Sequence, residues 1–427
     1  MTRTIGLDLG RHGGEAALID ERGRTSSLGH LLVRRDALEA FAATLGPDDQ
    51  VVLEASTNTW AIADILAAHA GRIVVSNPLR TRAIAQAKVK TDEIDARTLA
   101  SLLAADYIPE VWQPDPVTRE LRRRVAFRAG LVRNRTLLRN RVHAILGAAL
   151  VAAPVADVFG VRGRAWLAAV PLGPDAREAL EAHLRLHDAV EREIALAERA
   201  TARVVVGDRG TRHLLTIPGI GLTTAASMRA VTGDVTRFPR PAKLTSYLGL
   251  DPRVRQSGQH SFTGHISRAG QAHARSLLIE AAHSAVRTPG PLRAFYLRVK
   301  ARRGANVAVV ATARKLAVLA WHLLTHDADY RFSPPSRTAE KLRALELLAG
   351  RPKRMSRTGM RIVGPGAARA RRRAERERER LVLTAAEAAY VEQVRARAER
   401  ARARDAAAAT GERLDGPVMP EPAAPRS

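Results

Sequence analysis

The pattern of apolar and polar positions changes along the chain. In roughly the first 80 residues, short apolar runs typical of buried strands alternate with stretches whose apolar residues recur at helical spacing. The apolar runs predict strands at residues 4–9, 15–20, 27–33, 51–56 and 72–76, and the other stretches predict helices at residues 36–45 and 60–70. This order of elements predicts an α/β domain with the first strand near the centre of its sheet.

Two longer segments are helical in pattern throughout. Residues 117–150 are dense in arginine, with apolar residues at helical intervals, and residues 175–206 repeat that spacing. The proline- and glycine-containing link between Pro154 and Pro174 separates them, which predicts an antiparallel, coiled-coil-like pair. Such a pair serves as a stalk or an oligomer contact, or it is a plain helical subdomain, and the pattern favours neither alternative.

From Leu214 onward the pattern predicts a mostly helical domain. The stretch LLTIPGIGLTTAA predicts a helix end, a glycine turn and a second helix, and a Gly/Ser-rich loop then leads into another helix. A further helix is expected at about residues 307–325. Beyond Ser333-Pro334-Pro335, arginine, alanine and glutamate dominate, as in a charged helix or a solvated tail, and the last residues are expected to be disordered. The expected domains are residues 1–112, 113–208, 209–335 and 336–427.

The charge of the chain indicates a polyanionic partner. The 427 residues include 69 Lys and Arg against 43 Asp and Glu, a formal net charge of +26. Nucleic acid is the usual partner of so basic a protein, and an anionic membrane surface is the alternative. No run of 18 apolar residues and no charged-then-apolar leader is present, so we expect a cytoplasmic, soluble protein. The absence of cysteine excludes disulfides and zinc–thiolate sites.

Four acidic residues stand out against this basic background. Asp8 lies in the first apolar run, Glu54 ends a later one, and Asp92 and Asp95 lie three residues apart in a helical stretch. An unpaired carboxylate in a buried strand is costly, so Asp8 and Glu54 require a reason. Carboxylates that converge from strands and a helix are the ligands that Mg²⁺ prefers, and paired Mg²⁺ ions support phosphoryl transfer. Singly, Asp8 could instead cap a turn, and the helical pair could form surface ion pairs with Lys88, Lys90 or Arg97.

The segments around these acids carry a resemblance. GLDLG, VVLEAS and NPLRTRAIAQAKVKTDEIDARTLA resemble the DEDD-type transposases of bacterial insertion sequences, the insertion-sequence-110 family, also called bridge recombinases. The resemblance implies a RuvC-like first domain with a ribonuclease-H fold, and it implies that Asp8, Glu54, Asp92 and Asp95 are the catalytic, Mg²⁺-binding acids. KTDEIDA is the most specific part, whereas Arg11 stands where the family usually has a lysine.

The resemblance extends through roughly residues 4–330. IPGIGLTTA, TRFPRPAKLTSYLGLDPRVRQSG, GHISRAGQAHARSLLIEAA and ATARKLAVLAWHLL resemble the family's C-terminal transposase domain. It implies that Ser257, in Gln256-Ser257-Gly258, is the nucleophile, although a Ser-Gly pair taken alone is a common turn. A serine hydroxyl needs activation, which a neighbouring metal would supply. Gln271 stands where the family commonly has asparagine.

Glycines and arginines in this half are the expected nucleic-acid contacts. PGIG at residues 218–221 resembles the glycine hairpin between helices that binds a phosphate backbone through main-chain N–H groups, and an ordinary connection between helices fits equally well. The histidines at positions 260, 265 and 273 could polarise phosphate oxygens or be solvated, and they are left out of the catalytic set. The expected contacts are Gly219, Gly221, Arg253, Arg255, Gly258 and Arg268.

Together these features predict a transposase that cuts and rejoins DNA strands. The resemblance further implies a structured guide RNA encoded by the element. Because Ser257 and the acids fall in separate predicted domains, we also expect a dimer or tetramer, joined by the helical pair, in which they meet between subunits. Two other hypotheses remain open at this point. One is a metal-dependent junction endonuclease that uses water, and the other is a non-catalytic nucleic-acid-binding protein.

Overall fold

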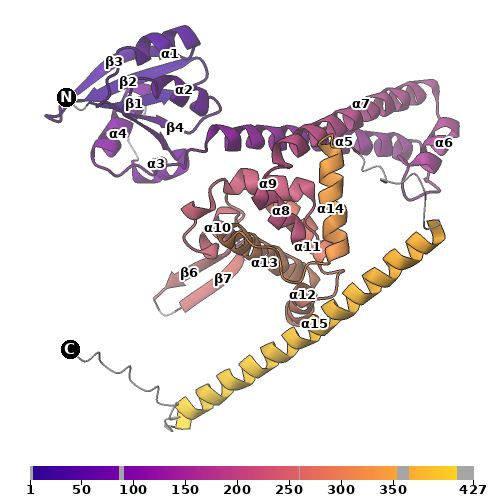
Figure 1. Cartoon of the computed structure of the whole chain (residues 1–427). Helices are drawn as coiled ribbons and strands as arrows, with labels where there is room; N and C mark the ends of the chain where they lie inside the picture. Colours follow the sequence, from indigo (N-terminus) through magenta and orange to yellow (C-terminus); the bar gives the residue numbers. More distant parts are fainter. Residues whose placement is uncertain (1–2, 86–90, 259, 353–364, 411–427) are drawn as a thin grey trace. The chain divides into compact units, whose positions relative to one another are not determined.

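The computed structural model describes residues 3–85, 91–258, 260–352 and 365–410. The chain divides into two compact units, residues 1–114 and residues 115–427. Each unit has its own hydrophobic clusters, and none of these clusters contains residues of both units. Figure 1 shows the sheet of the first unit and the helices of the second.

The first unit is built on a five-stranded sheet of order β3-β2-β1-β4-β5. Strand β1 pairs antiparallel with β2 and parallel with β4, which pairs parallel with β5, so the prediction of a central first strand is confirmed. Strands β1 and β4, which are parallel neighbours in the centre of the sheet, are apolar because both of their faces are covered. The strands are β1 (Thr4–Leu9), β2 (Gly13–Ile19), β3 (Thr25–Leu32), β4 (Gln50–Glu54) and β5 (Arg72–Ser76).

Helices cover both faces of this sheet. On one face, α1 (Arg35–Ala42) and α2 (Thr59–Leu66) pack against a cluster that includes Val51 and Leu53. On the other face, α4 (Asp92–Ala104) packs against Val52. Alternate residues of β4 therefore belong to different cores, as the two-residue period of a strand requires. A short helix, α3 (Pro78–Ile84), follows β5.

Helix α4 lies very close to β1 because β1 carries a glycine where the two meet. A Cβ atom at Gly6 would lie 2.1 Å from the carbonyl oxygen of Ala96 and 2.7 Å from the amide nitrogen of Ala100. The side chain of Thr91 caps α4 by accepting a hydrogen bond of 3.2 Å from the Ile94 amide. The close contact at Gly6 therefore fixes the distance between β1 and α4, the helix that carries the TDEIDA residues.

In the second unit, two long helices run side by side, as Figure 1 shows. They are α5 (Pro116–Ala148) and α7 (Pro174–Val205). Ion pairs join Arg128 to Glu198 at 2.6 Å and Arg135 to Glu191 at 3.3 Å, so residue numbers rise along one helix as they fall along the other. The pair is antiparallel. The connecting segment, predicted as a link, contains a further helix, α6 (Val161–Ala169), which packs with Leu167 in a small core between the long helices.

The rest of the second unit is a helical body around one large core. Helix α13 is long and apolar enough to cross a membrane by length and composition alone. It instead forms part of this core, with Ala313, Leu316 and Ala320 fully buried. The other elements are α8 (Arg209–Thr216), α9 (Leu222–Thr232), η1 (Val235–Arg237), α10 (Pro241–Tyr247), α11 (Ala272–Ala285), α12 (Pro291–Arg303) and α13 (Ala305–His326).

A β-hairpin replaces the Gly/Ser-rich loop that the sequence predicted. Strand β6 (Pro252–Ser257) pairs antiparallel with β7 (His260–Ile266). The prediction of a loop was wrong because none of the β6 residues is buried, so the apolar run that marks a strand is missing. A weaker signal was present, since arginine and serine alternate with other residues along β6.

The C-terminal region is helical where the structure describes it, in α14 (Pro335–Leu348) and α15 (Pro365–Thr410). Of the two alternatives for this region, the described residues form the charged helix. Two glutamates attach α15 to the body: Glu387 accepts a hydrogen bond of 2.9 Å from the Gly290 amide, and Glu379 accepts one of 2.7 Å from the Ser336 amide. Both amides begin helices, where a carboxylate is favourable. The expected disordered end lies outside the described residues.

Candidate functional site

The carboxyl ends of β1 and β4 bring two acids to one edge of the sheet. Leu7 pairs in register with Leu53, so Asp8 and Glu54 are the next residues along two parallel neighbouring strands. Gly6 and Val52 face α4, and because side chains alternate along strands, Asp8 and Glu54 face the same side. The covering helix adds Asp95 from its first turn. Three predicted acids therefore come from β1, β4 and α4 to one place.

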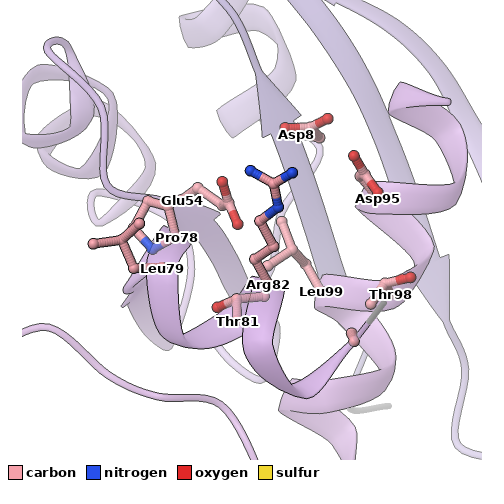
Figure 2. Close-up of a pocket in the computed structure, with 10 residues that line it drawn as sticks. Asp8, Glu54, Pro78, Leu79, Thr81, Arg82, Asp95, Thr98 and Leu99 are labelled. Carbon is pink, nitrogen blue, oxygen red and sulfur yellow. The ribbon is translucent and has the colours of Figure 1, made fainter. Parts of the chain in front are cut away.

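These three acids line a cavity of about 410 Å³, here called the acid pocket. Figure 2 shows their carboxylates around one space, with the guanidinium of Arg82 pointing into it from α3. All three acids are half-buried, so solvent screens their mutual repulsion only in part. The remaining wall is polar at Thr81 and Thr98 and apolar at Leu99.

The fourth predicted acid is placed differently. Asp92 is the first residue of α4 and exposed, and it is not among the described residues that line the acid pocket. Of the predicted surface ion pairs, Arg97 pairs with neither Asp92 nor Asp95 but with Glu93. Lys88 and Lys90 lie outside the described residues. The helix N-terminus favours acids in this turn whether or not they bind a ligand.

The chemistry of the acid pocket fits a hard divalent cation. Carboxylate oxygens are the donors that Mg²⁺ prefers, and the pocket presents three of them from three different elements. Over the described residues, no group of three or more His, Asp or Glu side chains is already close enough together to hold a metal. The donors are thus of the right kind on a preformed scaffold, and binding a cation would require their side chains to close together.

Ser257 lies in a very different environment in the second unit. It is the last residue of β6, exposed, and opposite His260 at the tip of the hairpin. Gly258 follows with φ +57°, a left-handed conformation that glycine adopts without strain, and a Cβ there would meet nothing within 4 Å. Arg253 and Arg255 precede Ser257 at alternate positions and so share its face of the strand. The tip therefore presents an exposed hydroxyl on a face that carries two arginines toward the base, where the Arg253 guanidinium donates to the Ser267 carbonyl at 3.1 Å.

The base of this hairpin is firmly attached to the helical body. Asp251 accepts hydrogen bonds from the Thr245 hydroxyl at 2.8 Å and from Arg314 Nε at 3.0 Å. Gly249 has φ +68°, and a Cβ there would lie 2.1 Å from the Ala269 carbonyl oxygen. A cavity of about 380 Å³ on the hairpin is lined by three arginines at positions 253, 255 and 268, with Phe262 and His265. The expected arginine contacts therefore lie on one surface.

The two glycines of the PGIG turn have different reasons to be glycine. Gly219 has φ +83°, and a Cβ there would lie 2.2 Å from the Ala281 carbonyl oxygen of α11, so packing alone accounts for it. Gly221 is exposed at the N-cap of α9, with nothing within 4 Å of an added Cβ. The open helix N-terminus at Gly221 is the part of this turn that a phosphate could reach.

Two residues that the sequence did not single out belong to these sites. Arg82 lines the acid pocket, and Lys341 holds the PGIG turn by donating to the carbonyls of Leu215 and Ile217 at 2.8 and 2.9 Å. Burial lowers the pKa of Lys341 to about 8. Neither residue is marked in the sequence, because their helices α3 and α14 are short and rich in other basic residues. His273 lies on α11 and not on the hairpin, and burial, together with the charges of Arg128 and Arg133, lowers its pKa.

Comparisons with known proteins match both halves of the chain. A family profile described as "Transposase IS116/IS110/IS902 family" matches residues 211–297, and a "Transposase" profile for the DEDD type of IS110 matches residues 5–150. A "Probable family 20 transposase" of Pseudomonas aeruginosa is 31% identical over 57% of this chain and 75% of its own length. The IS1111A transposase of Coxiella burnetii is 28% identical over 57% and 68%. The IS1328 transposase of Yersinia enterocolitica is 26% identical over 76% and 98%.

Proposed function

The chain belongs to the IS110 family of DEDD transposases and is a DNA transposase, and from this premise we propose that it uses the acid pocket and Ser257 together to cut and rejoin strands. The observation that carries the proposal is the convergence of Asp8, Glu54 and Asp95 on one pocket from β1, β4 and α4. Strand order and helix cover are those expected of a RuvC-like, ribonuclease-H fold.

The acid pocket is the proposed metal site. Membership of a DEDD transposase family implies a divalent cation. We propose that this cation is Mg²⁺ and that Asp8, Glu54 and Asp95 hold it, with Asp92 three residues before Asp95 on α4. When bound, the cation would stabilise negative charge on the phosphate and favour the deprotonated hydroxyl. The protein's own contribution is to place the carboxylates on buried strands and a capped helix, so that little rearrangement is left for the reaction.

Ser257 is the proposed nucleophile. Its Oγ attacks the scissile phosphorus, the serine proton passes to solvent, and the P–O bond to the 3′ oxygen breaks. The 3′ oxygen takes up a proton from solvent, which leaves a 3′-OH and a 5′-phosphoserine link. A 3′-OH of the new partner strand then attacks the same phosphorus, a phosphodiester forms, and the serine is released. Bond energy is conserved, so no nucleotide cofactor is needed. Exposure of Ser257 at the hairpin tip, with Arg253 and Arg255 on its face, supports access to DNA.

The assembly around this chemistry is part of the proposal. The acids and Ser257 lie in separate units of the chain, which is compatible with a dimer or tetramer that brings them together. The antiparallel α5–α7 pair is the proposed coiled-coil contact of that oligomer. The basic charge is expected to bind element ends, target DNA and a structured guide RNA. We place this activity in the bacterial cytoplasm, at the nucleoid.

Excision in cells tests the proposal. The gene with its native flanking DNA is placed on a plasmid, and amplification across the joined element ends detects an excised circle. We expect a circle from wild type and none from Asp8→Ala or Ser257→Ala. The matched controls Asp36→Ala and Ser261→Ala, an exposed acid and a neighbouring serine, should keep it.

The other outcomes separate the alternative functions. A circle that persists in Ser257→Ala would transfer the chemistry to water, as in a junction endonuclease, or to another serine. A circle that persists in Asp8→Ala would remove the acid pocket from the reaction. Nucleic-acid binding without a circle in wild type, with the guide RNA and both flanks supplied, would leave only a binding protein.

A further inference from the structure

The acid pocket contains a positively charged side chain that has no part in the proposed binding of Mg²⁺. Of the described residues that line the pocket, Arg82 alone carries a positive charge, and Figure 2 shows its guanidinium among the carboxylates of Asp8, Glu54 and Asp95. A guanidinium is planar, remains charged and offers paired donors that suit a carboxylate or a phosphate equally well. Its position therefore bears on both partners of the reaction.

The backbone below Arg82 is held in place. Asn77 caps α3 by accepting a hydrogen bond of 3.2 Å from the Arg80 amide, and Pro78 occupies the first helical position. Thr81 is buried and shares a hydrogen bond between hydroxyls with Ser76. Arg82 itself is exposed, so its long side chain can change direction from a fixed starting point. Arg80, on the same helix, does not line the pocket.

Charge decides what such a side chain does. Three carboxylates that face one half-buried cavity repel one another, and a guanidinium among them offsets part of that repulsion. A divalent cation would be attracted by the same oxygens and repelled by the guanidinium, so the two compete. With the divalent cation bound, the guanidinium would lie beside a positively charged site, to which a DNA phosphate is attracted.

We propose that Arg82 is a further functional residue of the acid pocket, which competes with the divalent cation for the carboxylates and then contacts a non-bridging oxygen of the scissile phosphate. This inference rests on the proposed function, because it requires the acid pocket to bind the cation. It assigns Arg82 a direct role in substrate binding, distinct from the backbone contacts expected of the arginines on the hairpin.

Metal binding tests the competition without relying on activity. The full-length protein, treated with chelator and dialysed, is titrated with Mn²⁺, and free Mn²⁺ is followed by electron paramagnetic resonance. Removing one positive charge from the lining of the acid pocket should make Arg82→Gln bind Mn²⁺ roughly tenfold more tightly than wild type. Arg82→Lys retains the charge and Arg80→Gln removes one outside the pocket, so both should stay close to wild type. Unchanged or weaker binding in Arg82→Gln would overturn the competition.

Strand cleavage tests the phosphate contact. With a labelled duplex that carries the element end and saturating Mn²⁺, Arg82→Gln should lower kcat by roughly 100-fold, because one donor to the phosphate charge is missing. Arg80→Gln should cleave at the wild-type rate. Cleavage by Arg82→Gln at the wild-type rate would overturn the phosphate contact.

A third variant separates this inference from the proposed function. Asp8→Asn should lose tight Mn²⁺ binding. If it binds Mn²⁺ like wild type, the proposed metal site itself is wrong. If Asp8→Asn loses the cation while Arg82→Gln binds it unchanged, the metal site stands and only the role of Arg82 is overturned.

Discussion

Asp8 and Glu54 follow strand residues that are almost wholly buried, whereas Ser257 ends a strand on which every residue is exposed. The acids are placed by a sheet with helices on both faces. The serine is placed by a two-stranded hairpin whose base is attached to the helical body through Asp251. Two groups proposed for one reaction are thus held by scaffolds of very different rigidity.

This contrast indicates which half of the site is preformed. Strands and a capped helix can hold carboxylates to within the tolerance that catalysis requires, because their positions depend on a packed core. The hairpin tip has little to fix it within its own unit, so its final position has to come from DNA, RNA or another subunit. Substitutions in the packed scaffold of the acid pocket should therefore cost more stability than substitutions at the exposed tip of the serine hairpin.

The largest effect is expected where α4 meets β1. Gly6→Ala would place a Cβ 2.1 Å from the backbone of Ala96, so α4 must move away and take Asp95 with it. We expect a loss of about 3 kcal/mol in the free energy of unfolding, and no excised circle. Thermal melting and the excision assay measure the two effects.

Gly46→Ala is the matched control for this change. Gly46 lies in the same unit, and an added Cβ would have Asp49 Oδ2 as its nearest neighbour at 3.8 Å. It should melt and excise like wild type. If Gly6→Ala also does so, the close contact between strand and helix is not what holds the acid pocket.

A smaller effect concerns alkaline pH and belongs to the second unit alone. The pKa of Lys341 falls from 10.5 to about 8 on folding because the amine is buried. Below pH 8 both states are protonated; between pH 8 and 10.5 the unfolded state binds more protons, so stability rises with pH. Relative to Lys341→Met, wild type should gain about 1 kcal/mol per pH unit at most over this window.

Denaturant unfolding at pH 7.5, 8.5 and 9.5 measures this difference. Lys243→Met removes an exposed lysine of the same unit and should run parallel to wild type at every pH. A constant gap between wild type and Lys341→Met would show that the amine under the PGIG turn does not change its protonation on folding.

The smallest effect is expected at the tip of the hairpin. Gly258→Ala adds a Cβ in open space and costs only the strain of a left-handed conformation, about 1 kcal/mol. Gly258→Asn should cost less, since asparagine tolerates this conformation. Gly249→Ala, at the base, meets the backbone of Ala269 and should lower the melting temperature clearly. Equal melting temperatures for Gly258→Ala and Gly249→Ala would contradict the view that the base of the hairpin is packed and its tip is not.

Much of the first unit could be predicted from the sequence. Four of its strands contain buried apolar runs, and local periodicity identified its strands and the helices α1 and α2 and placed β1 at the centre. The strand-end positions of Asp8 and Glu54 followed from the same pattern. The second unit was harder where burial is weak: the hairpin around Ser257 and the helix α6 have no strong apolar run or stripe.

The helices at the C-terminal end show a second limit. Their composition allowed either a helix or a solvated tail, because arginine and glutamate serve both. Two glutamates of α15, which accept hydrogen bonds from amides at the starts of other helices, and the buried Leu383 attach α15 to the body. The two hydrogen bonds join residues 97 and 43 positions apart, and no local pattern marks them.

The sequence by itself determined the order of the strands in the first unit, the excess of positive charge and the acids on and at the end of those strands, because these depend on local periodicity and residue type. Only the tertiary structure decided that Asp95 joins Asp8 and Glu54 in one pocket, that Asp92 remains exposed, that Arg82 points among the carboxylates, and that Gly219 is required by packing. The reason is physical: which side chains meet depends on how strands pair and how closely a helix packs on them, and these distances are properties of the folded core.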